Sequence, residues 1–131
     1  MFEAMRQAAF LHKLATKDPR AVSARTAIEM ATIGGARVIG REKQLGSLEA
    51  GKLADLIVVR MDQPRQTPMY EPMSHIVYTS RGDDVVSTVV NGQVLMRDGK
   101  VITLNESEVL AAANKASGTV RAAVAAAPGQ K

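Results

Sequence analysis

Apolar and polar positions alternate with helical spacing at the start of the chain. From Met1 to about Thr16, polar residues fall on one narrow stripe while apolar residues cover the rest of the circumference. The stripe consists of Glu3, Arg6, Gln7 and Lys13. The pattern predicts a helix that is buried on most of its surface, between two packed layers. No capping residue precedes it, and we expect a strand and a loop before it in the intact protein.

Further helices are predicted up to Gly40. Asp18-Pro19 breaks the first helix, and Ser23 is the expected N-cap of a second one. Thr32 is expected to cap a short third helix over 33–39. Gly40 suits the position after that helix, where φ is positive.

Two adjacent glycines lie inside the predicted third helix. Gly34 and Gly35 are interpreted as permitting close backbone packing. A phosphate-binding loop is the alternative, but neither a GxGxxG nor a Walker pattern surrounds them.

Beyond Gly40 the pattern is typical of strands. Residues 54–60 form a short apolar run rich in branched side chains, which predicts a buried strand. Prolines at 64, 68 and 72 mark an irregular segment of about a dozen residues. We interpret it as a surface crossover, and a loop that covers another part of the protein is the alternative. Asn91-Gly92 predicts a hairpin between 85–90 and 93–96, and Asp98-Gly99 a second reversal. The middle of the chain is therefore predicted to be a small antiparallel meander plus one further strand.

A last helix is predicted near the end of the chain. Asn105, with Glu108 three residues later, forms a capping signal for a helix that runs to about Ala126, ahead of a Pro-Gly tail.

Length and composition limit the fold class. A chain of 131 residues suits one compact domain and cannot hold a complete (β/α)₈ barrel, which needs about 250 residues. Hydrophobic residues make up 46% and aromatic residues 3%, so the core must be largely aliphatic and Met. There is no cysteine and no apolar run long enough to span a membrane, and we expect a cytoplasmic protein.

The formal net charge of +4 is spread over the chain. The nearest approach to a basic cluster is Arg37, Arg41 and Lys43, which we interpret as a solvated loop. Contact with phosphate or nucleic acid is the alternative, but no aromatic residues are interleaved with these side chains. No nucleic-acid partner is predicted.

Few residues offer catalytic chemistry. A catalytic zinc site needs about three protein ligands, and the two histidines, His12 and His75, lie far apart in the sequence. We interpret both as hydrogen-bonded structural residues. Ser74 and His75 are adjacent in sequence, which does not give the geometry of a catalytic triad.

The acidic candidates are also interpreted as structural. The pair Asp83-Asp84 has the composition of a cation site or of an acid and base, but beside Gly82 it is more typical of a turn. Among the acidic residues Asp55 is the one expected to be partly buried, because it enters an apolar strand, and to accept backbone hydrogen bonds from the turn before it. We therefore predict no catalytic, cofactor-binding or metal-binding residue in this chain.

Several linked motifs resemble the C-terminal end of metal-dependent amidohydrolases. They are MFEAMRQAAFLHK, MATIGGARVIG, LGSLEAGKLADLIVV, PMSHIVY and VVSTVVNGQVLMRDGKV. In this order they are similar to the aminohydrolase group that contains methylthioadenosine/S-adenosylhomocysteine deaminases, triazine hydrolases and guanine deaminases. The resemblance covers nearly the whole chain.

The resemblance implies an α+β fragment of a larger fold. Residues 1–40 would be the last helices of a (β/α)₈ barrel, 41–104 the C-terminal strands of a small composite β-sandwich, and 105–131 a C-terminal helix and tail. The family's metal-binding histidines and aspartate would precede Met1. The parent enzyme would use zinc or iron to hydrolyse a C–N bond of a purine-like or triazine-like heterocycle, and this chain alone would be an inactive scaffold without a cofactor.

Three hypotheses remain open at this stage. The chain is a fragment of an amidohydrolase, a small module that binds itself or another protein, or one subunit of a split enzyme whose barrel is a separate chain. Exposed apolar surface predicts a homo-oligomer in the second case.

Overall fold

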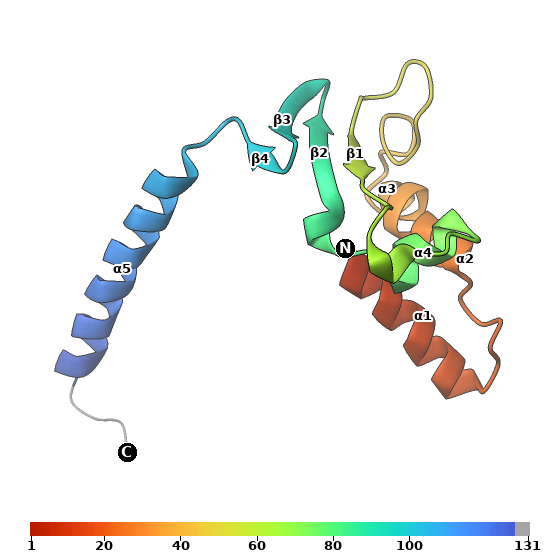
Figure 1. Ribbon diagram of the computed structural model, residues 1–131, viewed down its shortest axis with the longest axis horizontal. Helices are drawn as coiled ribbons and strands as arrows, with labels where there is room; N and C mark the ends of the chain where they lie inside the picture. The colour runs from red at the N-terminus through yellow and green to blue at the C-terminus, as the bar shows by residue number, and fades with distance from the viewer. Residues whose placement is uncertain (128–131) are drawn as a thin grey trace. The chain divides into compact units, whose positions relative to one another are not determined.

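The computed structural model describes residues 1–127 as two units, each of mixed or helical secondary structure (Figure 1). The first unit covers Met1–Lys100 and the second begins at Val101. The helices of the first unit are α1 (Phe2–Thr16), α2 (Ala24–Glu29), α3 (Gly35–Val38) and α4 (Pro72–Tyr78). Its strands are β1 (Leu56–Val59), β2 (Val85–Val90) and β3 (Gln93–Arg97), and β4 (Lys100–Val101) lies at the boundary of the two units.

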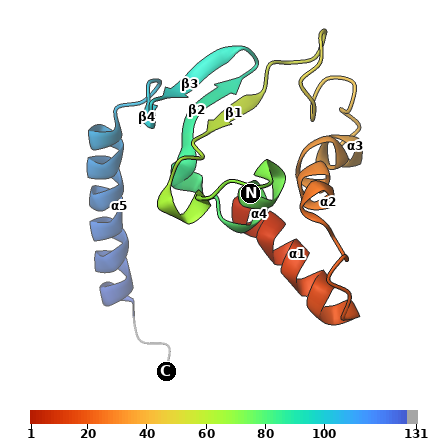
Figure 2. The same ribbon diagram turned by 45° about the vertical axis from the view of Figure 1, so that its right-hand side comes forward.

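Helices α1, α2 and α4 pack against one another and form the core (Figure 2). The core cluster consists of Met5 and Ala9 from α1, Ala27 from α2 and Val77 from α4. The prediction that α1 is buried on most of its circumference is wrong for this chain. Leu14 on the same helix is 77% exposed, because the described residues supply packing partners on one side of α1 only.

Helical backbone continues from α2 to α3 through a π-helical turn, Met30–Gly34. Ser23 caps α2 as predicted, since its Oγ accepts a hydrogen bond from the Thr26 backbone N–H at 3.1 Å. The predicted cap at Thr32 is wrong. Thr32 lies inside the π turn and donates to the Ile28 carbonyl at 2.7 Å, and no cap is needed where the helix does not restart.

The paired glycines lie in and beside the same turn. A Cβ on Gly34 would lie 2.9 Å from the Glu29 carbonyl oxygen, so this glycine is needed for a close approach within its own helix. At Gly35 the nearest atom is 3.5 Å away, which is an ordinary contact. Gly40 has the predicted positive φ, of 67°.

The four strands form one sheet in the order β1-β2-β3-β4, in which β2 pairs antiparallel with both β1 and β3. Asn91 and Gly92 form the predicted turn between β2 and β3, with φ of 48° and 78°. Asp98 and Gly99 form the second predicted turn, with φ of 50° and 74°. Both pairs occupy the left-handed region that these residue types tolerate best.

The connection from α3 to β1 folds back onto the helix. Gly46 has φ of 89°, and a Cβ there would lie 2.7 Å from Ile33 Cα and 2.9 Å from Ala36 Cβ. Two carbon atoms that are not bonded to each other do not approach so closely, so only glycine fits at position 46. This contact holds the loop against α3.

The segment between β1 and β2 is less irregular than predicted. It contains a 3₁₀ turn, Pro64–Gln66, and then α4, which begins at Pro72. Gln66 and Ser80 are both 0% exposed, and Gln66 Nε2 donates to Ser80 Oγ at 3.0 Å. The Ser80 carbonyl also accepts a hydrogen bond from the Arg6 guanidinium at 2.8 Å, which joins α1 to this segment.

A buried ion pair closes the same segment. Asp84 is 3% exposed, pairs with the Arg65 guanidinium, and accepts from the Arg81 backbone N–H at 2.8 Å. Burial raises the pKa of Asp84, but the hydrogen bonds from Arg81 and Arg65 and the charges of Arg65 and Arg60 outweigh it. The pKa of this carboxyl therefore lies below its ordinary value of 3.8.

The second unit contains one long helix, α5 (Glu106–Ala126). Its predicted cap is confirmed, since Asn105 Oδ1 accepts from the Ser107 and Glu108 backbone N–H groups, and Asn105 Nδ2 donates to the Glu108 carboxylate at 2.8 Å. The predicted Pro-Gly tail lies outside the described residues.

Gly46→Ala should destabilise the fold far more than Gly51→Ala. Both glycines have φ near 90°, but a Cβ on Gly51 meets nothing within 4 Å. We expect Gly51→Ala to cost about 1–2 kcal/mol of unfolding free energy from backbone strain alone. Gly46→Ala should cost about 2 kcal/mol more because of overpacking against α3. Urea unfolding followed by far-UV circular dichroism measures both, and equal losses would contradict the close contact.

Arg65→Gln should destabilise the protein by about 2 kcal/mol at pH 7, because it leaves a buried carboxylate without its cation. The arginine is 31% exposed, which reduces the loss below that of a fully buried pair. An acid whose pKa is lowered by folding contributes stability above its unfolded pKa and loses it as the pH falls through the folded value. The difference between the two proteins should therefore shrink below about pH 4.

The matched control is Arg20→Gln. Arg20 pairs with Asp18 at 3.3 Å, but its side chain is 90% exposed. This substitution should change neither the unfolding free energy at pH 7 nor its dependence on pH. If Arg65→Gln and Arg20→Gln lower the free energy of unfolding equally, the buried Arg65–Asp84 pair stabilises the protein no more than the exposed Arg20–Asp18 pair does.

Candidate functional site

The two histidines lie on different helices. His12 is exposed on α1, and His75 is half-buried on α4. The interpretation of His75 as a hydrogen-bonded residue is wrong for its Nδ1, which is buried and has no hydrogen-bond partner among the described residues. In residues 1–127 no three side chains of His, Cys, Asp or Glu are grouped closely enough to share a metal ion. A catalytic zinc, which needs about three such ligands, does not fit this donor set.

The other predicted candidates are occupied by structural hydrogen bonds. Ser74 lies in the first turn of α4, where its backbone N–H donates to the Glu71 carboxylate at 2.6 Å. This bond is the main reason why the pKa of Glu71 is lowered. Asp83 and Asp84 lie in a 3₁₀ turn, as the interpretation of this pair as a turn predicts. Asp84 is held by Arg65, so it is not a free acid or base.

The prediction for Asp55 is wrong in two respects. Asp55 is exposed, and the buried carboxylate of the chain is Asp84. Asp55 Oδ1 accepts a hydrogen bond from the Asn91 backbone N–H at 2.6 Å, and not from the turn before it. The reason is the pairing of β1 with β2, which brings the residue before β1 to the turn after β2.

The basic residues Arg37, Arg41 and Lys43 are all exposed, as expected of a solvated loop. The Arg41 guanidinium donates two hydrogen bonds, at 2.7 and 3.1 Å, to the side-chain oxygen of Gln44. Among the described residues, these three side chains have no other feature beside them that would indicate a phosphate site.

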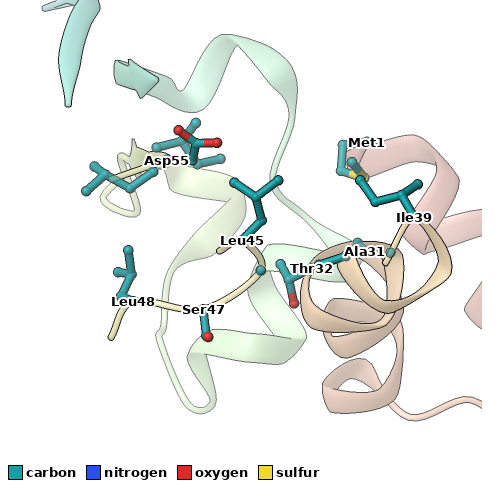
Figure 3. A pocket seen from close by; sticks show the side chains of 13 residues that line it. Met1, Ala31, Thr32, Ile39, Leu45, Ser47, Leu48 and Asp55 are labelled. Carbon is teal, nitrogen blue, oxygen red and sulfur yellow. The ribbon is translucent and has the colours of Figure 1, made fainter. Parts of the chain in front are cut away.

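One hollow of the first unit is open and mostly apolar. It has a volume of about 560 Å³ and is bordered by Met1 and by residues of the α2–α3 helix, the loop after α3 and β1 (Figure 3). Met1, Ile39, Leu48 and Ile57 border it and are 77%, 63%, 73% and 50% exposed. Apolar side chains gathered at this degree of exposure are typical of a contact surface.

The polar groups in this hollow already have partners. Thr32 donates to the Ile28 carbonyl, and Asp55 accepts from Asn91. The Ser47 hydroxyl donates to Glu49 and accepts from Lys52. Small-molecule sites usually combine an apolar lining with a few polar groups directed at the ligand. Here those groups are satisfied within the chain, so the hollow has little to offer a polar substrate.

A second, smaller hollow continues the same surface. It has a volume of about 190 Å³, lies between α1 and α2, and shares Met1 and Ala31 with the first. Met30 borders it and is 52% exposed. We call the combined surface the apolar face, defined by Met1, Met30, Ile39, Leu48 and Ile57. Its chemistry is that of packing rather than catalysis.

Sequence reasoning missed the polar contacts that hold the segment between β1 and β2. Arg65 and Asp84 are 19 residues apart, and Gln66 and Ser80 are 14 apart. The only available signal was that Asp84 directly precedes an apolar strand, and nothing in the sequence indicated its partner.

No helix within residues 1–127 is both long enough and apolar enough to cross a membrane.

Comparison with known proteins extends over most of the chain. Residues 1–95 match the amidohydrolase family. A 5'-deoxyadenosine deaminase from Methanosarcina mazei is 44% identical over 117 residues, which are 89% of this chain and 27% of that protein. A 5-methylthioadenosine/S-adenosylhomocysteine deaminase from Moorella thermoacetica is 48% identical over 110 residues, 84% of this chain and 26% of that protein.

Solved structures have the same arrangement of helices and strands. A zinc-bound adenosine deaminase from Xanthomonas campestris matches with a TM-score of 0.89 and 30% identity, over 93% of this chain and 28% of that one. A zinc-bound atrazine chlorohydrolase from Arthrobacter aurescens matches with a TM-score of 0.78 and 31% identity, over 88% of this chain and 26% of that one. The chain spans about a quarter of the length of the relatives it matches.

The resemblance seen in the sequence motifs is confirmed by the family match and by relatives at 44% and 48% identity. This mixed helix-and-strand chain belongs to the amidohydrolase family.

Proposed function

We propose that this chain is the C-terminal portion of a metal-dependent amidohydrolase that deaminates a purine nucleoside, and that it acts as scaffold. The observation that carries the proposal is the pair of relatives at 44% and 48% identity, both named as deaminases of adenine nucleosides, of which it spans about a quarter. Deamination of an adenine ring replaces the exocyclic amine by an oxygen from water and releases ammonia. The residues that perform this reaction would lie in the remaining three quarters.

The scaffold role is supported by the chemistry of the described residues. Metal ligands are not grouped in them, and the polar side chains of the apolar hollow beside Met1 are engaged within the chain. Zinc is present in the structurally similar proteins, so the intact enzyme would carry a metal bound elsewhere. This chain would contribute shape and stability.

The apolar face gives the scaffold a contact surface. Met1 and Leu48 are more than 70% exposed, which is unfavourable in water. In the intact enzyme we expect this face to pack against the rest of a (β/α)₈ barrel. Residues 1–40 would complete that barrel, 41–104 would complete a composite β-sandwich, and 105–131 would end the chain. The lack of cysteine fits a reducing compartment, so we place the protein in the cytoplasm.

Between the two classes of heterocycle, the purine is favoured. Both curated relatives, at 44% and 48% identity, are named as purine nucleoside deaminases. The identities of the solved structures do not separate the two classes, because the adenosine deaminase is 30% and the atrazine chlorohydrolase 31% identical. Pocket residues of the remaining chain would decide which 5'-substituted adenosine is accepted.

A chimera tests the scaffold role. In the Methanosarcina mazei enzyme, the matching 117 residues are replaced by those of this chain. Loaded with zinc, the chimera should release ammonia from 5'-deoxyadenosine at a rate within about tenfold of the parent rate. Its catalytic residues are those of the parent enzyme, so the rate can fall only because the exchanged scaffold positions them less well. The isolated chain with the same zinc should release none above background.

The control is the chimera with Gly46→Ala, which should lose thermal stability while its kcat per folded, zinc-loaded molecule stays unchanged.

Supplying this chain in trans to the rest of the parent enzyme tests the split-enzyme alternative, in which activity should appear only on mixing. Ammonia release by the isolated chain would refute the scaffold role. So would a folded, zinc-loaded chimera without activity.

A further inference from the structure

The turn between β2 and β3 carries a chemically reactive pair of residues. Asn91 and Gly92 form this turn, and both are exposed. In an Asn-Gly sequence the glycine backbone nitrogen can attack the asparagine side-chain carbonyl carbon, because glycine has no side chain to shield its nitrogen. The other asparagines, Asn105 and Asn114, are each followed by a long charged side chain that hinders this attack. Asn91 is therefore the asparagine of this chain that is chemically most susceptible.

The attack converts the side-chain amide into an acid by way of a cyclic imide. The Gly92 nitrogen loses its proton to base and forms a bond to Asn91 Cγ, while the bond from Cγ to the amide nitrogen breaks and ammonia leaves. Water then opens the resulting succinimide ring at either carbonyl, which gives aspartate or isoaspartate at position 91. The reaction occurs once per chain and needs only base and water.

The folded turn opposes this reaction by its conformation. Asn91 has φ of 48°, in the left-handed region, where ψ is about +30 to +60°. At such a ψ the nitrogen of the next residue points away from the Cβ of Asn91, so the ring cannot close. Ring closure therefore requires rotation about the Asn91 Cα–C bond, which opens the turn.

Hydrogen bonds to the residues before β1 keep the turn closed. The Asn91 N–H donates to the Asp55 carboxylate at 2.6 Å, and the Gly92 N–H donates to the Ala54 carbonyl at 3.0 Å. The second bond engages the proton that the attacking nitrogen must lose. The first has a charged acceptor, which makes it the stronger of the two. Both acceptors are brought to the turn by the pairing of β1 with β2.

We propose that Asn91 is a deamidation site whose rate is set by local opening of this turn, and that Asp55 protects it by keeping the turn closed. Local openings of this kind occur without unfolding of the whole unit. The product keeps the turn open: aspartate at position 91 adds a second negative charge beside Asp55, and isoaspartate adds a carbon to the main chain of a tight turn. The end of β1 that precedes Ile57 of the apolar face would then lose its attachment to β2. The proposal concerns the first unit only and does not depend on the scaffold role.

Peptide mass spectrometry of the full-length protein tests the assignment of the site. Samples taken during incubation at constant pH are digested with trypsin, which places Asn91 in peptide 82–97 and the other asparagines in peptide 101–115. Peptide 82–97 should convert to its aspartate and isoaspartate forms at a rate that rises with hydroxide concentration, and peptide 101–115 should stay unconverted. Equal conversion of the two peptides would overturn the assignment of Asn91.

Asp55→Ala tests the protection. Loss of the charged acceptor should raise the rate of conversion at Asn91 about tenfold, because the open turn becomes more populated. The substitution lies outside peptide 82–97, so the same peptide is measured in both proteins. Asp18→Ala serves as the comparison, since Asp18 also accepts a backbone N–H, from Arg20 at 2.9 Å, in a different exposed turn. It should leave the rate at Asn91 unchanged.

Further variants separate local opening of the turn from unfolding of the unit. Gly46→Ala destabilises the fold away from the turn and should leave the rate at Asn91 unchanged. Asp55→Asn keeps an acceptor without the charge and should give a rate between those of the wild type and Asp55→Ala. Circular dichroism establishes that each variant is folded.

The protection by Asp55 is overturned if Asp55→Ala converts no faster than the wild type, or if Gly46→Ala converts as fast as Asp55→Ala. It is also overturned if the native protein converts at Asn91 as fast as the same protein unfolded in urea, because the closed turn would then offer no restraint.

Discussion

The governing constraint on this chain is that its apolar side chains exceed what it can bury by itself. Among the described residues only five hydrophobic side chains are buried, and three of these are alanines. Large apolar side chains such as Leu14, Leu48 and Ile39 are more than half exposed. Burial of apolar area is the main favourable term in folding, at about 25 cal/mol per Å². A chain with so small a core therefore depends on apolar contacts with another surface, and the apolar face of the first unit is where such contacts are available.

Polar contacts define the shape of the first unit where the apolar core is thin. The Arg65–Asp84 pair, the Gln66–Ser80 hydrogen bond and the bond from Arg6 to Ser80 lie close together in the chain's longest connection. Buried polar groups are costly unless paired, so each pairing excludes alternative conformations of this segment. The connection between β1 and β2 is held by these contacts rather than by a large hydrophobic cluster. These contacts fix the position of the connection, although its regular structure is limited to a 3₁₀ turn and the short helix α4.

Local signals in the sequence were sufficient to predict most helices, strands and turns. They failed where the conformation or a hydrogen-bond partner depends on other parts of the chain. Ser23, Asn105 and the Asn91-Gly92 turn act through atoms within three or four residues, so their roles follow from the sequence. The prediction for Thr32 failed because a π turn keeps the helix continuous, and the prediction for Asp55 failed because its hydrogen-bond donor lies in the turn after β2. The prediction that this chain has no metal site came from its composition, because two histidines and no cysteine provide few metal ligands. The hollow and its lining depend on tertiary packing and could not be predicted.

Side-chain type explains why the exposed surfaces are suited to packing. The chain is 3% aromatic and has no tryptophan, so it offers few rings for stacking on a heterocycle. The apolar face is Met, Ile and Leu, which fill irregular gaps between helices and sheets. A surface of this kind suits a broad, irregular apolar partner better than it suits a flat polar ring, because it offers packing contacts and few directed hydrogen bonds.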